Sequence, residues 1–426
     1  MAFLNNDNSN IYLRPRVMAI FSLGVASGFP YAMVAATLTQ WLSEEGVSRG
    51  SIGLFTLVLL SYSFKPFWAW ILDAVRLPVL TKILGHRRSW LLVADGLLVL
   101  ALALLSQTNP VGNLELTAYM AIAVAVASAT QDIVIDAYRI EILDEEEQGA
   151  GAAMVSYGWR TGAFLASTLA LLLAEYVGWS FAYSVMGAMV AFALVPAFFL
   201  GEPLRHKVAE KSDLLKDAIA PFKEFLTRHG AFIILAFVLL HKIGDTMANL
   251  MLRNLLVELE FTKPEVAFYD VAVGQVALFI GIAVGGFLYA RWGVAKSMLL
   301  SLVLMMISNL SFAVLAMIGH DVHFLAFTIG FENFASGVGG VIVVGYLSGL
   351  CNLAYTATQY ALLSGAAAIT GRFLTAPSGY LIDWVGFPVF YLITTAAAVP
   401  GIILFIFMIR NGFLGLEKPE TAPKST

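Results

Sequence analysis

Long apolar stretches run through the whole chain, and each is long enough to cross a lipid bilayer as a helix of about 20 residues. Of the 426 residues, 59% are hydrophobic and only 13% are charged, about half the charged fraction of an ordinary soluble domain. Inside hydrocarbon, a helix satisfies its backbone polar groups within the segment itself. The sequence therefore predicts an all-α polytopic membrane protein.

Twelve membrane-spanning helices are predicted from the apolar stretches and the polar breaks between them. The first follows a polar, basic segment and is too long for a signal peptide, so we interpret it as a spanning helix. The long charged connection 201–230 separates six helices from six. The predicted spans are 17–39, 52–73, 89–107, 115–140, 150–175, 179–200, 231–256, 266–290, 295–317, 322–349, 355–382 and 387–410.

The two groups of six are weakly repeated. Moving 37–53 forward by 214 positions aligns it with 251–267, with Ser48 over Thr262 and Arg49 over Lys263. Two related halves, 17–200 and 231–410, are typical of the major facilitator fold, in which substrate lies near the bilayer midplane where the halves meet. Lys and Arg gather in the connections on one side, which predicts that both termini, 1–16 and 411–426, are cytoplasmic.

Ionisable side chains interrupt the apolar stretches. A charge at bilayer depth is costly and normally faces a partner or a water-filled cavity, so these residues indicate a transport pathway. Estimated depths arrange them as a column across the membrane. The alternative is mutual neutralisation; Lys242 and Asp245, for example, lie three apart on one helix face and could form a silent ion pair. The set is Lys65, Asp132, Arg160, Lys242, Asp245, Glu332 and Arg372.

A proton carrier is expected among the acids. Asp136 lies close to Arg139 and is expected to pair on the cytoplasmic side, whereas Asp132 has no such neighbour. A desolvated carboxyl group can exchange protons at physiological pH, so Asp132 is the first candidate. Glu332 and Asp245 are the next ones.

Four cations in the spans suit a substrate with carboxylates, which arginine can hold through two hydrogen bonds. They are Lys65, Arg160, Lys242 and Arg372. Polar and aromatic groups could add the hydrogen bonds and stacking that a sugar needs, although Tyr and Trp also line membrane interfaces in general. These candidates are Tyr31, Gln40, Tyr62, Gln131, Tyr157, Trp159, Asn333, Gln359 and Tyr360. The Ser-Gly-Phe-Pro run 27–30 predicts a hinge or a cavity-lining break in the first helix.

The connection between the second and third spans suggests a cytoplasmic gate. Asp73 is followed by a basic loop with Arg87 and Arg88, which resembles the D-x-x-G-R-R loop of the major facilitator superfamily. We interpret Asp73 as a latch that pairs with Arg87, Arg88 or Arg139 while the inner gate is closed. In the alternative, the arginines only anchor the loop to anionic headgroups.

Catalytic and metal-binding patterns are missing from the sequence. Cys351 is the only cysteine, and His241 has no second His or Cys at ligand spacing. We find no nucleophile with an adjacent base and no P-loop. We therefore expect no enzyme, no metal, no cofactor and no nucleic-acid partner, and a monomer surrounded by membrane lipids.

Several blocks, in order along the chain, resemble the AmpG muropeptide permease family. They are SGFP (27–30), FKPFWAWILD (64–73), GHRRSW (85–90), SATQDIVIDAYR (128–139), HKIGD (241–245), FEN (331–333) and TQYALLS (358–364). The family's motif residues fall on Lys65, Asp132, Lys242, Asp245 and Glu332.

The resemblance implies a proton-driven importer in the inner membrane of a Gram-negative bacterium. Such importers carry N-acetylglucosaminyl-1,6-anhydro-N-acetylmuramyl peptides from the periplasm to the cytoplasm for cell-wall recycling, and the route feeds the signal that induces chromosomal beta-lactamase. Two alternatives stay open: a carrier of another large anion such as acetyl-coenzyme A, and a non-transporting sensor or assembly factor on the same fold. The charges buried in the spans favour a transporter over a sensor or an assembly factor.

Overall fold

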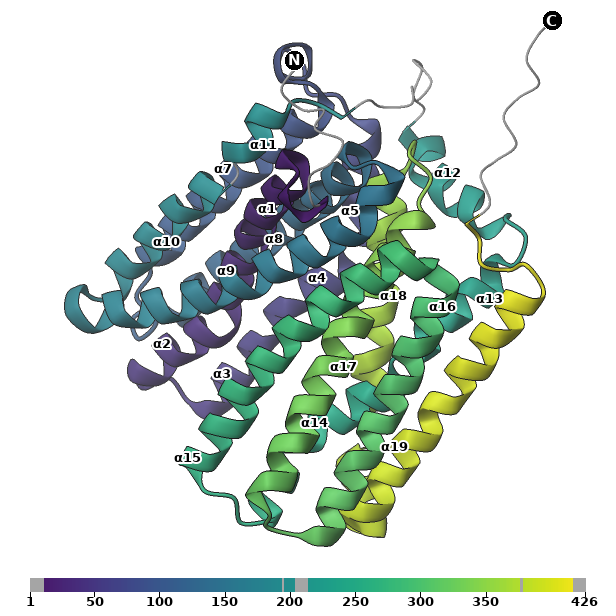
Figure 1. Cartoon of the computed structure of the whole chain (residues 1–426). Helices are drawn as coiled ribbons and strands as arrows, with labels where there is room; N and C mark the ends of the chain where they lie inside the picture. The colour runs from purple at the N-terminus through teal and green to yellow at the C-terminus, as the bar shows by residue number, and fades with distance from the viewer. Residues whose placement is uncertain (1–10, 194, 204–213, 376–377, 417–426) are drawn as a thin grey trace, which may run out of the picture. The chain divides into compact units, whose positions relative to one another are not determined.

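The computed structural model describes residues 11–193, 195–203, 214–375 and 378–416, and the regular structure in these ranges is helical (Figure 1). The chain divides into two compact units. The first unit extends to Pro221 and also includes Asn352–Gly365; the second unit comprises Phe222–Cys351 and the chain from Ala366 onward. The limits expected from the sequence, 1–16, 17–200, 201–230, 231–410 and 411–426, stay a prediction.

The first unit contains helices α1 to α11. Its first crossing continues from α1 (Pro15–Ala32) through a π-helical segment (Met33–Thr37) into α2 (Leu38–Glu44). The second predicted span is interrupted by a 3-10 segment, Thr56–Leu60, and consists of α3 (Arg49–Phe55), α4 (Ser61–Phe64) and α5 (Pro66–Ala74). The others are α6 (Leu80–Leu84), α7 (His86–Ser106), α8 (Leu114–Ile142), α9 (Gln148–Val177), α10 (Trp179–Ala193) and α11 (Val195–Leu200).

The connection 201–230 contains a helix that the sequence analysis missed, α12 (Leu214–Leu226). The later helices are α13 (Ala231–Leu240), α14 (Ile243–Glu258), α15 (Lys263–Val266), α16 (Gly274–Ile318), α17 (Val322–Gly349), α18 (Thr356–Thr375) and α19 (Ser378–Arg410). Gly293 and Gly386 interrupt α16 and α19 with φ angles of 72° and 74°, a region that favours glycine. Both interruptions fall where the sequence predicts a break between spans.

Eight helical stretches among the described residues are long and apolar enough to cross a membrane. The continuous stretch Pro264–Ile318 contains two predicted spans, 266–290 and 295–317. Three predicted spans are not covered by these eight: the interrupted 52–73, the span 150–175 on α9, and 355–382, whose residues 376–377 lie outside the described ranges. The eight stretches identify a polytopic membrane protein, and a count of twelve is consistent with them.

Side-chain acceptors fix the starts of two long helices. Asn113 accepts a hydrogen bond from the backbone nitrogen of Leu116 at the start of α8, at 2.9 Å. Asp321 accepts from the backbone nitrogens of Phe324 and His323 at the start of α17, at 2.9 Å each. These bonds hold the pKa of Asp321 below its usual range, because they favour the ionised carboxylate. Both caps satisfy donors that the first helical turn leaves unpaired.

Glycines bring α1 and α9 into backbone contact in the first unit. Gly24 and Gly28 on α1 face Gly158 and Gly162 on α9, and both pairs have a spacing of four residues. A Cβ added at Gly28 would overlap the carbonyl oxygen of Trp159. A Cβ added at Gly158 would overlap the carbonyl oxygen of Phe21 on α1. Small residues at this spacing allow helices in membranes to approach closely. The contact holds the Trp159 turn of α9 against the glycine-proline part of α1.

We expect Gly158→Leu to destabilise the protein by about 1–3 kcal/mol, the usual cost of overpacking, because the neighbouring backbone cannot move aside as a side chain can. Gly96→Leu on α7 is the matched control, since a Cβ there meets nothing within 4 Å. The measurement is thermal unfolding of both purified variants in detergent. Equal unfolding temperatures for the two variants would contradict close α1–α9 packing.

Candidate functional site

Lys65 forms the centre of an ion-pair cluster in the first unit. It lies at the junction of α4 and α5, and its Nζ is 2.7 Å from Oδ2 of Asp132 and 3.9 Å from Oδ2 of Asp136. The Ser27 hydroxyl donates to Oδ1 of Asp132 at 2.7 Å, and the Arg139 guanidinium lies 3.6 Å from Oδ1 of Asp136. Two acids thus face two bases. The expectation that Asp132 lacks a basic neighbour is wrong, because Lys65 approaches it from another helix.

An aromatic cluster with one arginine lies in the same unit. The Tyr31 ring is 5.3 Å from the Tyr62 ring, at an interplanar angle of 69°, and 5.3 Å from the Trp159 ring, at 53°. A 2.7 Å hydrogen bond between the hydroxyls of Tyr62 and Ser128 fixes one of the rings. The Arg160 guanidinium lies 5.7 Å from the centroid of Trp159.

Arg160 forms no ion pair and no hydrogen bond with any residue in the described ranges. Arginine stays charged in proteins, and its five donors point outward in a flat fork. A cation without an acid in a predicted span is therefore available to a bound anion. The neighbouring rings offer flat apolar faces on which a sugar can stack.

Three residues predicted to bind substrate have contacts with other residues of the protein. Gln131 is fully buried and donates to Oδ1 of Asp95 on α7 at 3.0 Å. Gln40 donates to Oε1 of Glu44, one turn further along the same helix, at 2.7 Å. Tyr157 interacts electrostatically with Tyr12. Gln131 and Gln40 thus have hydrogen-bond partners within the protein, and their role in substrate binding stays a prediction.

Two further predicted residues lie at the start of α18. The Gln359 side chain is fully buried, accepts from the backbone nitrogen of Asn352 at 2.7 Å and donates to the carbonyl of Pro221 at 3.2 Å. Tyr360 lies under the guanidinium of Arg139, 5.5 Å from its ring centroid. Both side chains hold this end of α18 within the first unit.

The second unit buries two carboxyl groups side by side. Glu332 on α17 is 1% exposed and accepts from Nδ2 of Asn249 at 2.8 Å and from the Ser308 hydroxyl at 2.6 Å. The amide of Asn249 is also 3.4 Å from Oδ1 of Asp245. The predicted pair exists as well: Nζ of Lys242 lies 3.6 Å from Oδ2 of Asp245.

A break in the helix places Lys242 and Asp245. Helix α13 ends at Leu240 and α14 begins at Ile243, with Lys242 between them at φ −118° and ψ 8°. Asp245 therefore lies in the first turn of α14, where the helix dipole favours a negative charge. The Lys242 side chain is 47% exposed, whereas that of Asp245 is 4% exposed. The break thus presents the cation outward and the acid inward.

Two other predicted binding residues belong to the later helices. Asn333 donates to the carbonyl of Ile329 on its own helix at 3.0 Å and packs against Gly274 of α16. The side chain of Arg372 lies outside the described residues, although its backbone belongs to α18.

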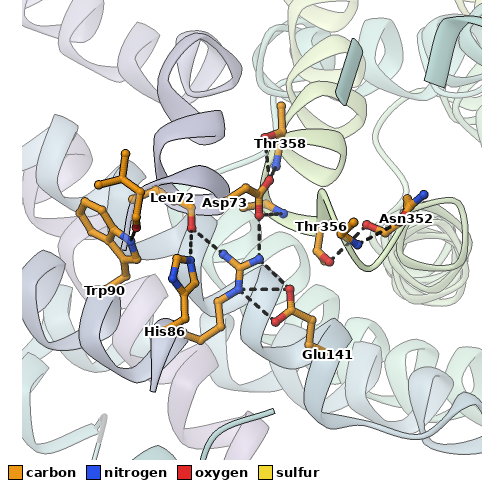
Figure 2. A network of polar contacts seen from close by, with 12 residues as sticks. Leu72, Asp73, His86, Trp90, Glu141, Asn352, Thr356 and Thr358 are labelled. Carbon is orange, nitrogen blue, oxygen red and sulfur yellow. Dashed lines mark hydrogen bonds and ion pairs between the residues drawn. The ribbon is translucent and has the colours of Figure 1, made fainter. Parts of the chain in front are cut away.

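Asp73 lies in a buried polar network, shown in Figure 2. Arg87 is fully buried and donates to Oδ1 of Asp73 at 2.7 Å, to both oxygens of Glu141 at 2.6–3.1 Å and to the carbonyl of Leu72 at 2.9 Å. Of the three arginines proposed as partners from the sequence, Arg87 therefore forms a direct bond to Asp73. Glu141, a second acid on the same guanidinium, was not predicted.

The Asp73 carboxylate also caps the start of α18. It accepts from the backbone nitrogens of Ala357 at 3.2 Å and Thr358 at 2.8 Å, and from the Thr358 hydroxyl at 2.7 Å. Free backbone N–H groups at a helix start favour a bound anion. Residues 352–365 belong to the first unit through contacts of this kind.

Arg88 points elsewhere. Its guanidinium lies 5.9 Å from the centroid of the Phe198 ring, and its backbone nitrogen donates to Oε2 of Glu202 at 3.1 Å. Oε1 of Glu202 accepts from the backbone nitrogen of Arg87 at 2.7 Å. Glu202 therefore caps α7, a role that no local sequence pattern indicated.

A family model, the Major Facilitator Superfamily, matches residues 20–251, more than half of the chain. A relative from Rickettsia conorii, putative transporter AmpG 4, is 33% identical over 411 residues, which cover 95% of this chain and 98% of the relative. The anhydromuropeptide permease of Escherichia coli K12 is 34% identical over 406 residues, 95% of this chain and 82% of the relative. The chain belongs to the AmpG family of the major facilitator superfamily.

Solved structures agree on the fold. The transporter FucP in its outward conformation aligns with a TM-score of 0.69 at 17% identity, over 93% of this chain and 99% of FucP. The proton:xylose symporter XylE aligns with a TM-score of 0.66 at 13% identity, over 94% of each chain. Membership of the AmpG family makes the chain a membrane transporter and not an enzyme, as the sequence predicts.

Proposed function

We propose that this AmpG-family chain imports N-acetylglucosaminyl-1,6-anhydro-N-acetylmuramyl peptides from the periplasm to the cytoplasm. The name of the Escherichia coli relative, anhydromuropeptide permease, supports this substrate class. Arg160 carries the proposal, because it pairs with no acid in the described part of the chain and lies against Trp159, which in turn contacts Tyr31. A muropeptide combines sugar rings with carboxylates, and this cluster offers a stacking face next to a bidentate donor.

The proposal includes the cellular setting. The protein acts as a monomer in the lipids of the bacterial inner membrane, with both termini in the cytoplasm according to the positive-inside rule. Import supplies cell-wall recycling and the signal that induces beta-lactamase. Protons drive it through one or more of Asp132, Asp245 and Glu332.

The Asp73 network is the proposed cytoplasmic latch. A carboxylate that accepts from Arg87 and from the start of α18 holds that end of the helix in place while the bonds last. Asp136 and Arg139 support it from α8, and Arg88 anchors the neighbouring loop. Opening toward the cytoplasm requires the Asp73–Thr358 bonds to break.

The test is uptake of labelled anhydro-muropeptide into proteoliposomes, with and without an imposed proton gradient. We expect accumulation only with the gradient. Uptake of acetyl-coenzyme A in place of the muropeptide would move the assignment to the other anion carrier. If the folded protein transports neither compound, the result would favour the sensor or assembly factor.

A double substitution tests the ion pair in the first unit. Lys65→Met is expected to cost on the order of 2 kcal/mol of stability, because it leaves the hydrogen-bonded Asp132 carboxylate without its cation. Adding Asp132→Asn removes that charge and is expected to restore part of the loss. Thermal unfolding of the single and double variants measures both effects. Additive losses in the double variant would mean that the two residues do not interact.

A further inference from the structure

Asp245 and Glu332 are two buried carboxyl groups that share one amide. Nδ2 of Asn249 lies 2.8 Å from Oε1 of Glu332 and 3.4 Å from Oδ1 of Asp245. Both side chains are nearly fully buried, Asp245 at 4% and Glu332 at 1% exposure. Two like charges this close and this far from water make the doubly ionised state costly. One bound proton therefore stabilises the pair.

The Ser308 hydroxyl can serve either state of Glu332. Its oxygen is 2.6 Å from Oε2 of Glu332 and 2.8 Å from the carbonyl oxygen of Met305. The hydroxyl donates to an ionised Glu332. When Glu332 is protonated, Ser308 can accept from it and donate to Met305.

Few other titratable groups surround the pair. Lys242 and His241 lie at the break before α14, and His241 interacts electrostatically with both Lys242 and Asp245. Tyr391 on α19 interacts with Glu332. Helix α16 contributes only the neutral Ser308 and the buried amide of Asn309.

The two units differ in their charge balance. In the first unit the cluster of Asp132 and Asp136 with Lys65 and Arg139 has two acids and two bases, so it is balanced without a proton. In the second unit one cation, Lys242, lies 3.6 Å from Asp245, and Glu332 adds a second acid, so one bound proton balances the set.

We infer that the Asp245–Glu332 pair, bridged by Asn249, holds the single proton that drives transport, and that Asp132 is a positioning residue for Lys65; this assignment rests on the proposed function. The pair binds one proton from the periplasmic side and releases one to the cytoplasm, and no other bond forms or breaks. After release both carboxylates are charged, and Lys242, at the helix break, is the cation able to approach them.

The transport test compares Glu332→Gln with two controls in proteoliposomes. Glutamine keeps the shape of a protonated glutamate but cannot release a proton. We expect this variant to lose the gradient-dependent part of uptake, so that uptake is equal with and without the gradient. The exposed acid control Glu258→Gln and the neighbour His241→Gln keep the dependence. Gradient-driven accumulation by Glu332→Gln, or its loss in His241→Gln alone, would overturn the assignment.

A spectroscopic test separates this inference from the substrate assignment. Infrared spectra of the purified wild-type protein should contain the C=O stretch of a protonated carboxyl group that shifts in D2O. The band should vanish in Glu332→Gln and persist in Glu258→Gln and Asp132→Asn; persistence in Glu332→Gln would overturn the inference whether or not muropeptide is transported. If Glu332→Gln does not fold, Asp245→Asn is used in its place. An altered C=O band in Asp245→Asn would support a proton shared by the pair. An unchanged band would overturn the inference.

Discussion

Replacing Arg87 with methionine is expected to destabilise the protein by about 3–5 kcal/mol, because two acids would stay buried without their cation. The guanidinium is fully buried and is the donor to both Asp73 and Glu141. Methionine fills a similar volume, so the loss of stability comes mainly from the missing charge and hydrogen bonds and less from changed packing. Thermal unfolding of the purified protein in detergent gives the size of the effect.

Arg88→Met is the matched control for Arg87→Met. The two arginines are adjacent on α7, but the guanidinium of Arg88 lies over the Phe198 ring, and a single cation–π contact is worth about 0.5–2 kcal/mol. We therefore expect a clearly smaller shift. Adding Glu141→Gln to Arg87→Met should recover part of the stability, since one of the stranded charges is removed. Equal losses for both arginines would contradict a special role of Arg87.

Arg160→Gln is expected to weaken the binding of anhydro-muropeptide by roughly 30-fold, about 2 kcal/mol, the low end of the cost of truncating one partner of a hydrogen-bonded charge pair. Arg160→Lys should recover only part of the affinity, because lysine cannot form the bidentate contact. The concentration dependence of uptake, or of binding to the purified protein, measures the change.

An amidated substrate provides the control for Arg160. When the carboxylates of the muropeptide are converted to amides, Arg160→Gln should bind it about as well as the wild type does. Lys82→Gln, on the exposed face of α6, should leave the binding of either substrate unchanged. A 30-fold loss with the amidated substrate as well would mean that Arg160 supports the fold of the site and does not contact a carboxylate.

Contacts between residues close in the sequence could be predicted, and contacts between distant helices mostly could not. Lys242 and Asp245 are three residues apart and form the expected ion pair, although Lys242 lies at a helix break and not on one continuous helix face. Breaks at Gly293 and Gly386 could be predicted because glycine and charged residues interrupt apolar runs there. Lys65 and Asp132 are 67 positions apart, and only helix packing reveals their contact.

The unpredicted members of the carboxyl cluster have a common reason. Asn249 and Ser308 are neutral, and single polar residues of these types are ordinary in membrane helices. Their importance comes from lying within 2.8 Å and 2.6 Å of Glu332, which depends on three helices meeting at one point. The burial cost of Glu332 could be read from its sequence context, but the groups that offset it could not.

The backbone contact between α1 and α9 also bears on inhibitor design. Glycines on both sides bring the two backbones together, so this contact fixes how α1 and α9 lie against each other. Tyr31 lies on α1 and Arg160 lies on α9, and the contact sets the spacing between them. A competitive inhibitor designed to reach both residues would therefore have its length set by this backbone contact.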